Sequence, residues 1–324
     1  MKRFFGAAAL IASAFFVSNP AQAACGKVTI SDMNWPSATF MANLDKLILQ
    51  HGFGCDAELI PGGIGISPMS MIEKGEPDIA PEMWYSSAEA LKKGMVEKRL
   101  RIAGKSLSDG GEEGFWVPQY MVDKDPSLAT IAGIKKNAKL FKHPEDPDKS
   151  AFIGCPAGWN CQITSGHQFK ALKLADAGFE LVNPGSLAAL DAEIIDAYQK
   201  KENILHYYWG PTTLTHKLST ELGGYVQLEE PAYTKECAAS DWGCAYPLAE
   251  VLIAVRKDLQ VAAPEIAEFL TKWDFTAGNQ LAAEGYMSDS GAEYPEVAAW
   301  FLKNTEDWKT WVAPGIADKV LEGL

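Results

Sequence analysis

The sequence predicts an α/β protein of two lobes with a ligand cleft between them. After the first 24 residues the chain follows a strand, loop, helix, strand order, which is the unit of a parallel sheet covered by helices. The chain of 324 residues is also longer than one hydrophobic core usually serves. Several tryptophans follow apolar strands among turn-forming residues, where sheets of this kind bind ligands.

An export signal is predicted over residues 1–23, because two basic residues precede an apolar run and Ala-Gln-Ala occupies 21–23. The apolar run is too short to span a membrane comfortably. We therefore expect a mature chain that starts near Ala24, is soluble and monomeric, and resides in the periplasm. A lipoprotein anchored through Cys25 is the alternative, although Gln22 occupies the position where a lipid-attachment site normally has Leu.

The opening segment predicts a strand from Val28, a loop over 31–37 and a helix with one apolar face over 40–48 that ends at Gly52. A second strand is expected over 57–60. This order predicts a parallel sheet, in which ligands bind beyond the carboxyl ends of the strands.

Later segments extend the α/β pattern and define the expected lobes. We assign residues 24–119 together with 246–324 to lobe 1, and residues 120–245 to lobe 2. The glycine cluster at 62–65 matches neither the dinucleotide nor the P-loop fingerprint, so it predicts a flexible turn into a helix that begins near Pro68. Strands are expected over 204–209 and 252–255, and helices over 187–200, 264–273, 295–302 and 308–321.

Charge and motif content argue against two function classes. The net charge of −13 becomes −15 once the two basic signal residues are removed, and no basic stripe offsets it, so nucleic acid binding is not expected. Catalysis is not indicated, because there is no Gly-x-Ser-x-Gly elbow and His167 and His206 have no motif partners. His206 lies inside an apolar strand and is expected to be buried and hydrogen-bonded. We expect a binding protein without a required cofactor.

Six cysteines in an exported protein favour disulfides, although sequence alone leaves many pairings open. A zinc site is the alternative, but no Cys-x-x-Cys or His-x-x-x-His spacing supports it. Proximity along the chain favours the nearest-neighbour pairs Cys25–Cys55, Cys155–Cys161 and Cys237–Cys244.

Four of the ten tryptophans, Trp84, Trp116, Trp159 and Trp209, lie in loop-like settings. Each follows or ends an apolar strand and is bracketed by proline, glycine or small polar residues, which places it at a strand end facing a cleft. Trp35, after the first strand, is intermediate between these cleft-facing tryptophans and core tryptophans. The others are expected in the core: Trp242, Trp273, Trp300, Trp308 and Trp311.

Four segments carry a resemblance to a known family: DIAPEMW at 78–84, GCPAGWNC at 154–161, YYWGP at 207–211 and CAYPLAEVLIAV at 244–255. They resemble the glycine betaine/proline betaine-binding proteins of ABC importers, the OpuAC type, over nearly the whole mature chain. The resemblance implies a type II periplasmic-binding fold, in which two α/β lobes joined by a hinge close on the ligand. It also implies an ABC membrane permease as partner.

The resemblance further implies that Trp84 comes from the first lobe and Trp159 and Trp209 from the second. It supports the Cys155–Cys161 disulfide, which would shape the loop that holds Trp159. A quaternary ammonium cannot donate a hydrogen bond, so a protein holds it by aromatic faces, each worth ~2 kcal/mol or more when desolvated. We expect a small methylated-ammonium ligand in a tryptophan box.

The anionic end of such a ligand needs hydrogen-bond donors. The backbone N–H groups of Asn160 and Cys161 lie at the expected start of a helix near Gln162, and helix N-termini present unpaired donors. An ordinary capped helix is the alternative. Glu113, next to Glu112, could place a negative charge beside the methyl groups, unless the two glutamates are simply solvated.

One departure from the family bears on the ligand. Glycine betaine binders of this type carry a histidine four residues after the first-lobe tryptophan, where it contacts the carboxylate, and this chain has Ala88 there. The chain therefore looks similar to the trimethylamine N-oxide-binding branch, whose ligand has a single oxygen in place of the carboxylate. Glycine betaine and choline are the alternatives, and a secreted enzyme acting on methylated amines is a remote one.

The acidic segment 143–150 is a candidate metal site. Related proteins have a calcium-like acidic loop in this region, and Glu145, Asp146 and Asp148 supply the hard oxygens that calcium takes. The spacing is not that of an EF-hand, and a plain solvated loop is the alternative.

Overall fold

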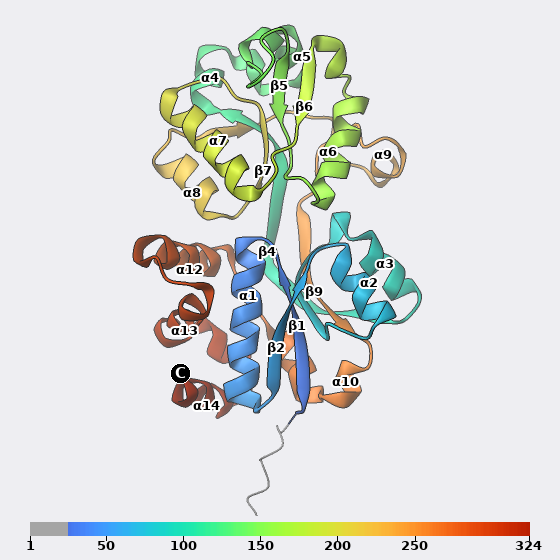
Figure 1. Ribbon diagram of the computed structural model, residues 1–324, viewed down its shortest axis with the longest axis vertical. Coiled ribbons are helices and arrows are strands. Elements are labelled where there is room, and N and C mark those ends of the chain that lie inside the picture. The colour runs from blue at the N-terminus through green and yellow to red at the C-terminus, as the bar shows by residue number, and fades with distance from the viewer. Residues whose placement is uncertain (1–24) are drawn as a thin grey trace, which may run out of the picture.

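The computed structural model describes residues 25–324, so the predicted signal at 1–23 lies outside the described residues. The chain folds as a mixed α/β protein, which confirms the predicted fold class. Figure 1 shows two groups of helices and strands stacked along the long axis. None of the helices in residues 25–324 has the length and apolar composition needed to cross a bilayer.

The described strands form one nine-stranded sheet in the order β2-β1-β3-β9-β4-β7-β5-β6, with β8 paired to β4. The 19-residue strand β4 pairs antiparallel with β9 along its first part and with β7 and β8 along its last part. β4 therefore belongs to both lobes. The strands are β1 (Lys27–Met33), β2 (Asp56–Gly62), β3 (Ile79–Trp84), β4 (Leu100–Pro118), β5 (Ser150–Ile153), β6 (Phe179–Val182), β7 (His206–Gly210), β8 (Tyr225–Gln227) and β9 (Ala249–Arg256).

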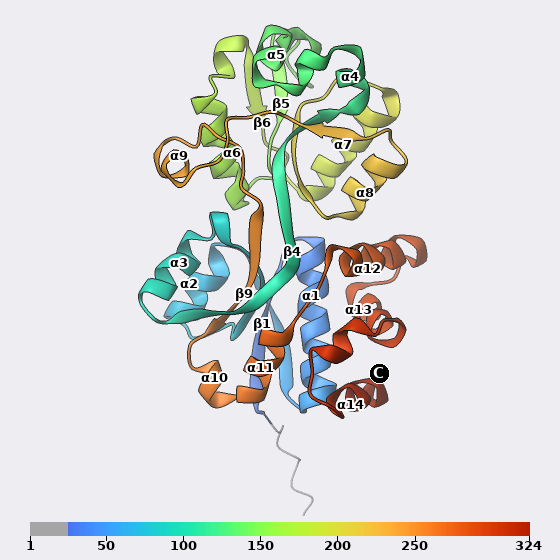
Figure 2. The same ribbon diagram turned by 180° about the vertical axis from the view of Figure 1, so that it is seen from behind.

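Helices cover the two parts of the sheet separately. The first lobe carries α1 (Pro36–Leu47), α2 (Ile66–Glu73), α3 (Glu89–Val96), α10 (Leu259–Ala262), α11 (Pro264–Lys272), α12 (Ala277–Ser290), α13 (Tyr294–Asn304) and α14 (Ile316–Gly323). The second lobe carries α4 (Gln119–Lys124), α5 (Ile131–Lys136), α6 (Asn160–Ala171), α7 (Leu187–Lys200), α8 (Thr213–Thr220) and α9 (Lys235–Ser240). Figure 2 shows the chain passing between the lobes along β4 and along the segment that leads into β9. The residue boundaries predicted for the lobes stay a prediction.

The opening βαβ unit forms as the sequence predicts. Strand β1 pairs parallel with β2, and Pro36 occupies the first turn of α1, where its missing N–H costs no hydrogen bond. Phe40, Leu44 and Ile48 are buried on one face, as the helical spacing requires.

One predicted helix is interrupted. The stretch expected to be helical over 308–321 forms a 3-10 turn at Asp307–Thr310, and α14 begins only at Ile316. Pro314 lies between them, and proline cannot donate the backbone hydrogen bond that a continuous helix needs. Trp273, Trp308 and Trp311 are buried in the core as expected, whereas Trp242 and Trp300 are only partly buried.

Three disulfides join the pairs that chain proximity predicts, namely Cys25–Cys55, Cys155–Cys161 and Cys237–Cys244. No free cysteine remains among residues 25–324. The first bond ties the start of β1 to the start of β2, and the other two close short loops of the second lobe.

The disulfides lead to a simple expected outcome. Alkylation of the native protein without reductant should add no mass, whereas alkylation after reduction and unfolding should label six cysteines. Intact-mass spectrometry measures both. Two or more labelled thiols in the native protein would contradict the pairing.

Candidate functional site

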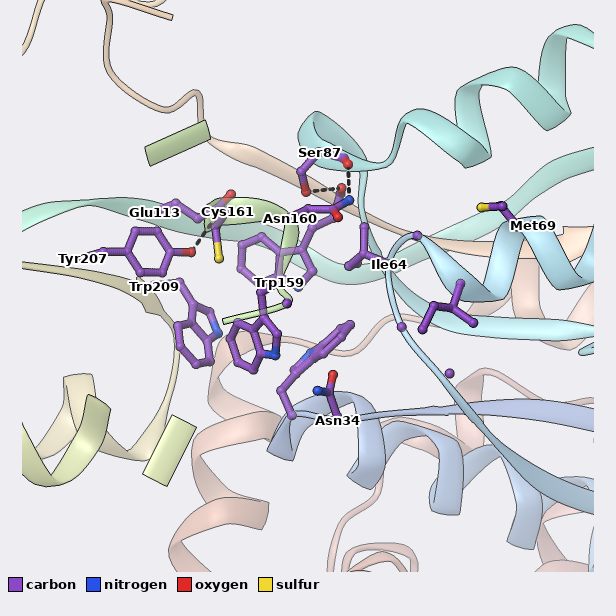
Figure 3. A pocket seen from close by; sticks show the side chains of 17 residues that line it. Asn34, Ile64, Met69, Ser87, Glu113, Trp159, Asn160, Cys161, Tyr207 and Trp209 are labelled. Carbon is purple, nitrogen blue, oxygen red and sulfur yellow. Dashed lines mark hydrogen bonds between the residues drawn. The ribbon is translucent and has the colours of Figure 1, made fainter. Parts of the chain in front are cut away.

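A cavity of about 360 Å³ lies between the lobes. Its wall is mainly apolar and aromatic and contains one carboxyl group, and no lysine, arginine or histidine of the described chain lines it. Figure 3 shows the lining side chains. They are Asn34, Trp35, Gly62, Gly63, Ile64, Gly65, Ile66, Met69, Trp84, Ser87, Glu113, Gly158, Trp159, Asn160, Cys161, Tyr207 and Trp209.

Four tryptophans from four segments line this cavity. Trp35 lies between β1 and α1, Trp84 ends β3, Trp159 precedes α6, and Trp209 belongs to β7. The ring centroids of Trp35 and Trp159 are 5.9 Å apart, and those of Trp159 and Trp209 are 5.2 Å apart, both edge-to-face. This spacing is typical of interacting aromatic rings. Two tryptophans therefore come from each lobe.

The loop before α6 fixes Trp159. Gly158 has φ +86, a left-handed conformation that favours glycine, and its N–H donates to the side-chain oxygen of Gln162 at 3.1 Å. Cys155 and Cys161 are buried and bonded to each other on either side of this turn. The disulfide and the turn together hold Trp159 at the N-terminus of α6.

Trp84 is held close to strand β4. A Cβ atom on Gly111 would lie 2.4 Å from Cη2 and 2.5 Å from Cζ3 of the Trp84 indole. Only glycine at position 111 lets the ring approach the strand this closely.

Glu113 and Tyr207 form a buried pair in the wall (Figure 3). Glu113 lies opposite Trp209 in the antiparallel pairing of β4 with β7, and the Tyr207 hydroxyl donates to Glu113 Oε1 at 2.8 Å. Glu113 Oε2 is buried without a partner among the described residues. Burial raises the pKa of Glu113 to about 7, and the Tyr207 hydrogen bond opposes part of that rise.

Trp116 does not join the site predicted for it. It is fully buried, stacks on Tyr225 with centroids 4.3 Å apart, and is absent from the cavity wall. The reason is strand geometry, because residues three apart on a strand point to opposite faces, and Glu113 takes the cavity face.

Other lining residues were missed in the sequence. Tyr207 stands two residues before Trp209 on the same strand and so shares its face, a signal that could have identified it. The glycine segment from Gly62 to Gly65 forms one wall instead of a plain turn. Ser87 lines the cavity, whereas its neighbour Ala88 is fully buried and does not. His206 is buried and hydrogen-bonded, as expected. Its partner is the Tyr198 hydroxyl, and burial lowers the pKa of His206 to about 4.

Hydrogen bonds join the lobes on both sides of the cavity. The Asn160 amide donates to the Ser87 carbonyl at 2.6 Å (Figure 3). On the other side, the backbone N–H and the hydroxyl of Thr213, at the start of α8, donate to Glu284 of α12. These hydrogen bonds link the two lobes around the cavity.

The acidic loop is organised by its own hydrogen bonds. Asp146 Oδ1 accepts from the Asp148 N–H at 3.0 Å, and Lys149 Nζ lies 3.5 Å from Asp146 Oδ2 and 2.6 Å from Glu180 Oε2. No group of three or more His, Cys, Asp or Glu side chains within 25–324 is arranged to hold a metal. Calcium at Glu145, Asp146 and Asp148 stays a prediction that the structure does not support.

Comparisons with known proteins agree with this fold. Residues 26–304 match the family described as the substrate binding domain of ABC-type glycine betaine transport systems, and the chain belongs to that family. A glycine betaine/proline betaine-binding periplasmic protein of Escherichia coli is 26% identical over 218 residues, which cover 61% of this chain and 64% of that protein. The chain thus aligns with less than two thirds of this curated relative.

Solved structures define the fold class. A glycine betaine, L-proline-binding protein from Borrelia burgdorferi superposes with a TM-score of 0.71 at 20% identity, over 91% of this chain and 99% of that one. A choline-binding protein of an ABC transporter, in complex with choline, gives 0.68 at 17% identity, over 92% and 98% of the two chains. The predicted type II periplasmic-binding fold is confirmed.

Glu113 should make the stability of the ligand-free protein depend on pH. Its pKa is about 7 when folded and 4.5 ordinarily, so the folded state binds more protons between these values. The resulting stabilisation is present below about pH 4.5 and lost as pH rises through about 7, on the order of 3 kcal/mol in total. Denaturant unfolding between pH 5 and pH 8 should show this loss, and Glu113→Gln should reduce it.

Any difference in pH dependence between the parent and the Glu113→Gln protein comes from Glu113. Glu82 and Glu230, whose pKa values burial also raises to about 7, are present in both proteins. Equal pH slopes in the parent and the Glu113→Gln protein would contradict the assignment.

Proposed function

We propose that the chain is the solute-binding component of an ABC importer and that it binds trimethylamine N-oxide between its lobes. Family membership and the two-lobed fold support the transport role. The observation that carries the ligand class is the set of four tryptophans around one cavity, because aromatic faces are the groups that recognise a methylated ammonium. The permease of the importer is the membrane partner.

The polar groups of the wall favour a single-oxygen ligand over a carboxylate. A glycine betaine carboxylate would enter a cavity that contains Glu113 and no lining lysine, arginine or histidine. A carboxylate spreads its negative charge over two oxygens, and burying either oxygen without a hydrogen-bond donor is costly. Glycine betaine and the N-oxide are both neutral overall, but the N-oxide needs hydrogen-bond donors to one oxygen only.

Two groups can supply those donors. The first N–H groups of α6, at Asn160 and Cys161, lie at the positive end of the helix and line the cavity. Glu113 can donate a further hydrogen bond when protonated, which its raised pKa permits near neutral pH. Ala88 itself does not line the cavity.

Choline is the second candidate, and Glu113 is the observation that favours it. An ionised Glu113 would attract the cation and accept a hydrogen bond from its hydroxyl. The two ligands therefore require opposite protonation states of the same carboxyl group.

The aromatic wall can be tested by truncation. Replacing Trp84, Trp159 or Trp209 by alanine should weaken trimethylamine N-oxide binding at least tenfold, about 1.4 kcal/mol or more. Trp300→Ala is the matched control, because Trp300 stacks on Tyr286 away from the cavity. Isothermal titration calorimetry provides the affinities. The wall assignment fails if the three truncated proteins bind as the parent does.

The ligand is tested by titrating trimethylamine N-oxide, glycine betaine and choline at pH 6 and pH 8. We expect the N-oxide to bind at least tenfold more tightly than glycine betaine, and its affinity to fall at the higher pH as Glu113 ionises. Glu113→Gln keeps a donor without a charge, so it should keep N-oxide binding and lose the pH dependence. Choline affinity that rises with pH and exceeds that of the N-oxide would assign choline instead.

A further inference from the structure

Glu82 lies directly behind the tryptophan wall without lining the cavity itself. It is a fully buried residue of β3. Its Oε1 atom accepts three hydrogen bonds: from Trp35 Nε1 at 2.8 Å, from Trp84 Nε1 at 2.8 Å and from Ser37 Oγ at 3.0 Å. One carboxyl oxygen therefore binds both tryptophans that the first lobe contributes.

The chain brings these donors together from three segments. Glu82 and Trp84 are two residues apart on β3, so their side chains share a face of the strand. Trp35 follows the neighbouring parallel strand β1, and Ser37 lies in the first turn of α1. No tryptophan of the second lobe is bonded to this carboxyl group.

A carboxyl group is a costly choice at this buried position. Burial raises the pKa of Glu82 to about 7, whereas the hydrogen bonds from Trp35, Trp84 and Ser37 oppose that rise. Its second oxygen has no partner among the described residues, and no cation is among the groups that shift its pKa. A well-packed apolar residue is often more stable than a buried charged group. A glutamate at position 82 therefore indicates a role other than stabilising the fold.

The Trp84 ring is constrained at both ends. Glu82 accepts from its N–H, and the backbone at Gly111 lies against the opposite, benzene edge, as the 2.4 Å approach of a Cβ atom to Cη2 shows. The ring therefore has little freedom to rotate out of the cavity wall.

We propose that Glu82 is a positioning residue for ligand binding, whose carboxylate holds the Trp35 and Trp84 rings in their ligand-binding orientation and places a negative charge behind both. Groups that are ordered before the ligand arrives lose less entropy on binding, so pre-orientation raises affinity. A carboxylate bonded to the indole N–H groups also lies at the edges of both rings, outside the cavity lining, and attracts an ammonium in the cavity through a medium of low dielectric. This role rests on the proposed function.

Substitutions at Glu82 separate orientation from charge. Glu82→Gln keeps an acceptor oxygen for the indoles but removes the charge, and should weaken trimethylamine N-oxide binding about threefold to tenfold. Glu82→Leu removes both and should weaken it by more than about tenfold. Asp45→Asn is the matched control, because Asp45 is a fully buried carboxyl group of α1 without a hydrogen-bond partner among the described residues. It should change affinity less than about twofold.

A double-mutant cycle tests whether Glu82 acts through the indole N–H. Trp84→Phe keeps an aromatic ring but lacks the N–H, so Glu82→Gln should cost less affinity in that background than in the parent. Strictly additive effects of Glu82→Gln and Trp84→Phe would overturn the proposed mechanism.

A readout on the ligand-free protein separates this proposal from the proposed function. In a ¹⁵N-tryptophan-labelled protein the indole N–H signals of Trp35 and Trp84, assigned by Trp→Phe substitution, should move in Glu82→Gln, and the signals of Trp159 and Trp209 should not. Unchanged Trp35 and Trp84 signals would overturn the positioning role. A parent protein that binds none of the methylated ammonium ligands would remove the proposed function and still leave this measurement decisive for the position of the rings.

Discussion

The site depends on one geometric constraint, namely that rings from separate segments meet only where strands end. Trp35 and Trp84 follow or end neighbouring strands of the first lobe, and Trp209 lies near the end of β7 in the second. Trp159 follows β5 through a short loop. Because the carboxyl ends of parallel strands converge at one edge of a sheet, two such edges facing each other enclose a cavity. The long strand β4 connects them and adds Glu113.

Buried carboxyl groups give this cavity its electrostatic character. Glu82 lies behind the wall and Glu113 within it, and both are hydrogen-bonded only to neutral donors of the described chain. Burial without a cation is unfavourable for a carboxylate, which is why both pKa values rise to about 7. A methylated ammonium would supply the missing positive charge. Each of these carboxyl groups therefore costs stability when it is ionised without a positive charge near it.

The sequence predicted the elements whose signals are local. Helix α7 spans Leu187–Lys200 as expected, because its apolar period is uninterrupted, and the turn residues around Trp84, Trp159 and Trp209 indicated strand ends that converge on one cavity. The role of these tryptophans in ligand binding stays a prediction. Trp116 was placed wrongly because a strand's alternation shows which residues share a face but not which face meets the cavity. The position of Glu82 depends on the pairing of β1 with β3, which no single segment encodes.

The Cys155–Cys161 bond links the cavity to the redox state of its surroundings. The bond closes the loop that carries Trp159, and the thiols that would replace it under reducing conditions would leave that loop free to reorganise. Trp159 would then lose the loop that positions it, whereas the sheet and the first-lobe tryptophans would keep their positions. A copy of the chain in a reducing compartment would therefore keep the sheet but lack the covalent constraint on Trp159.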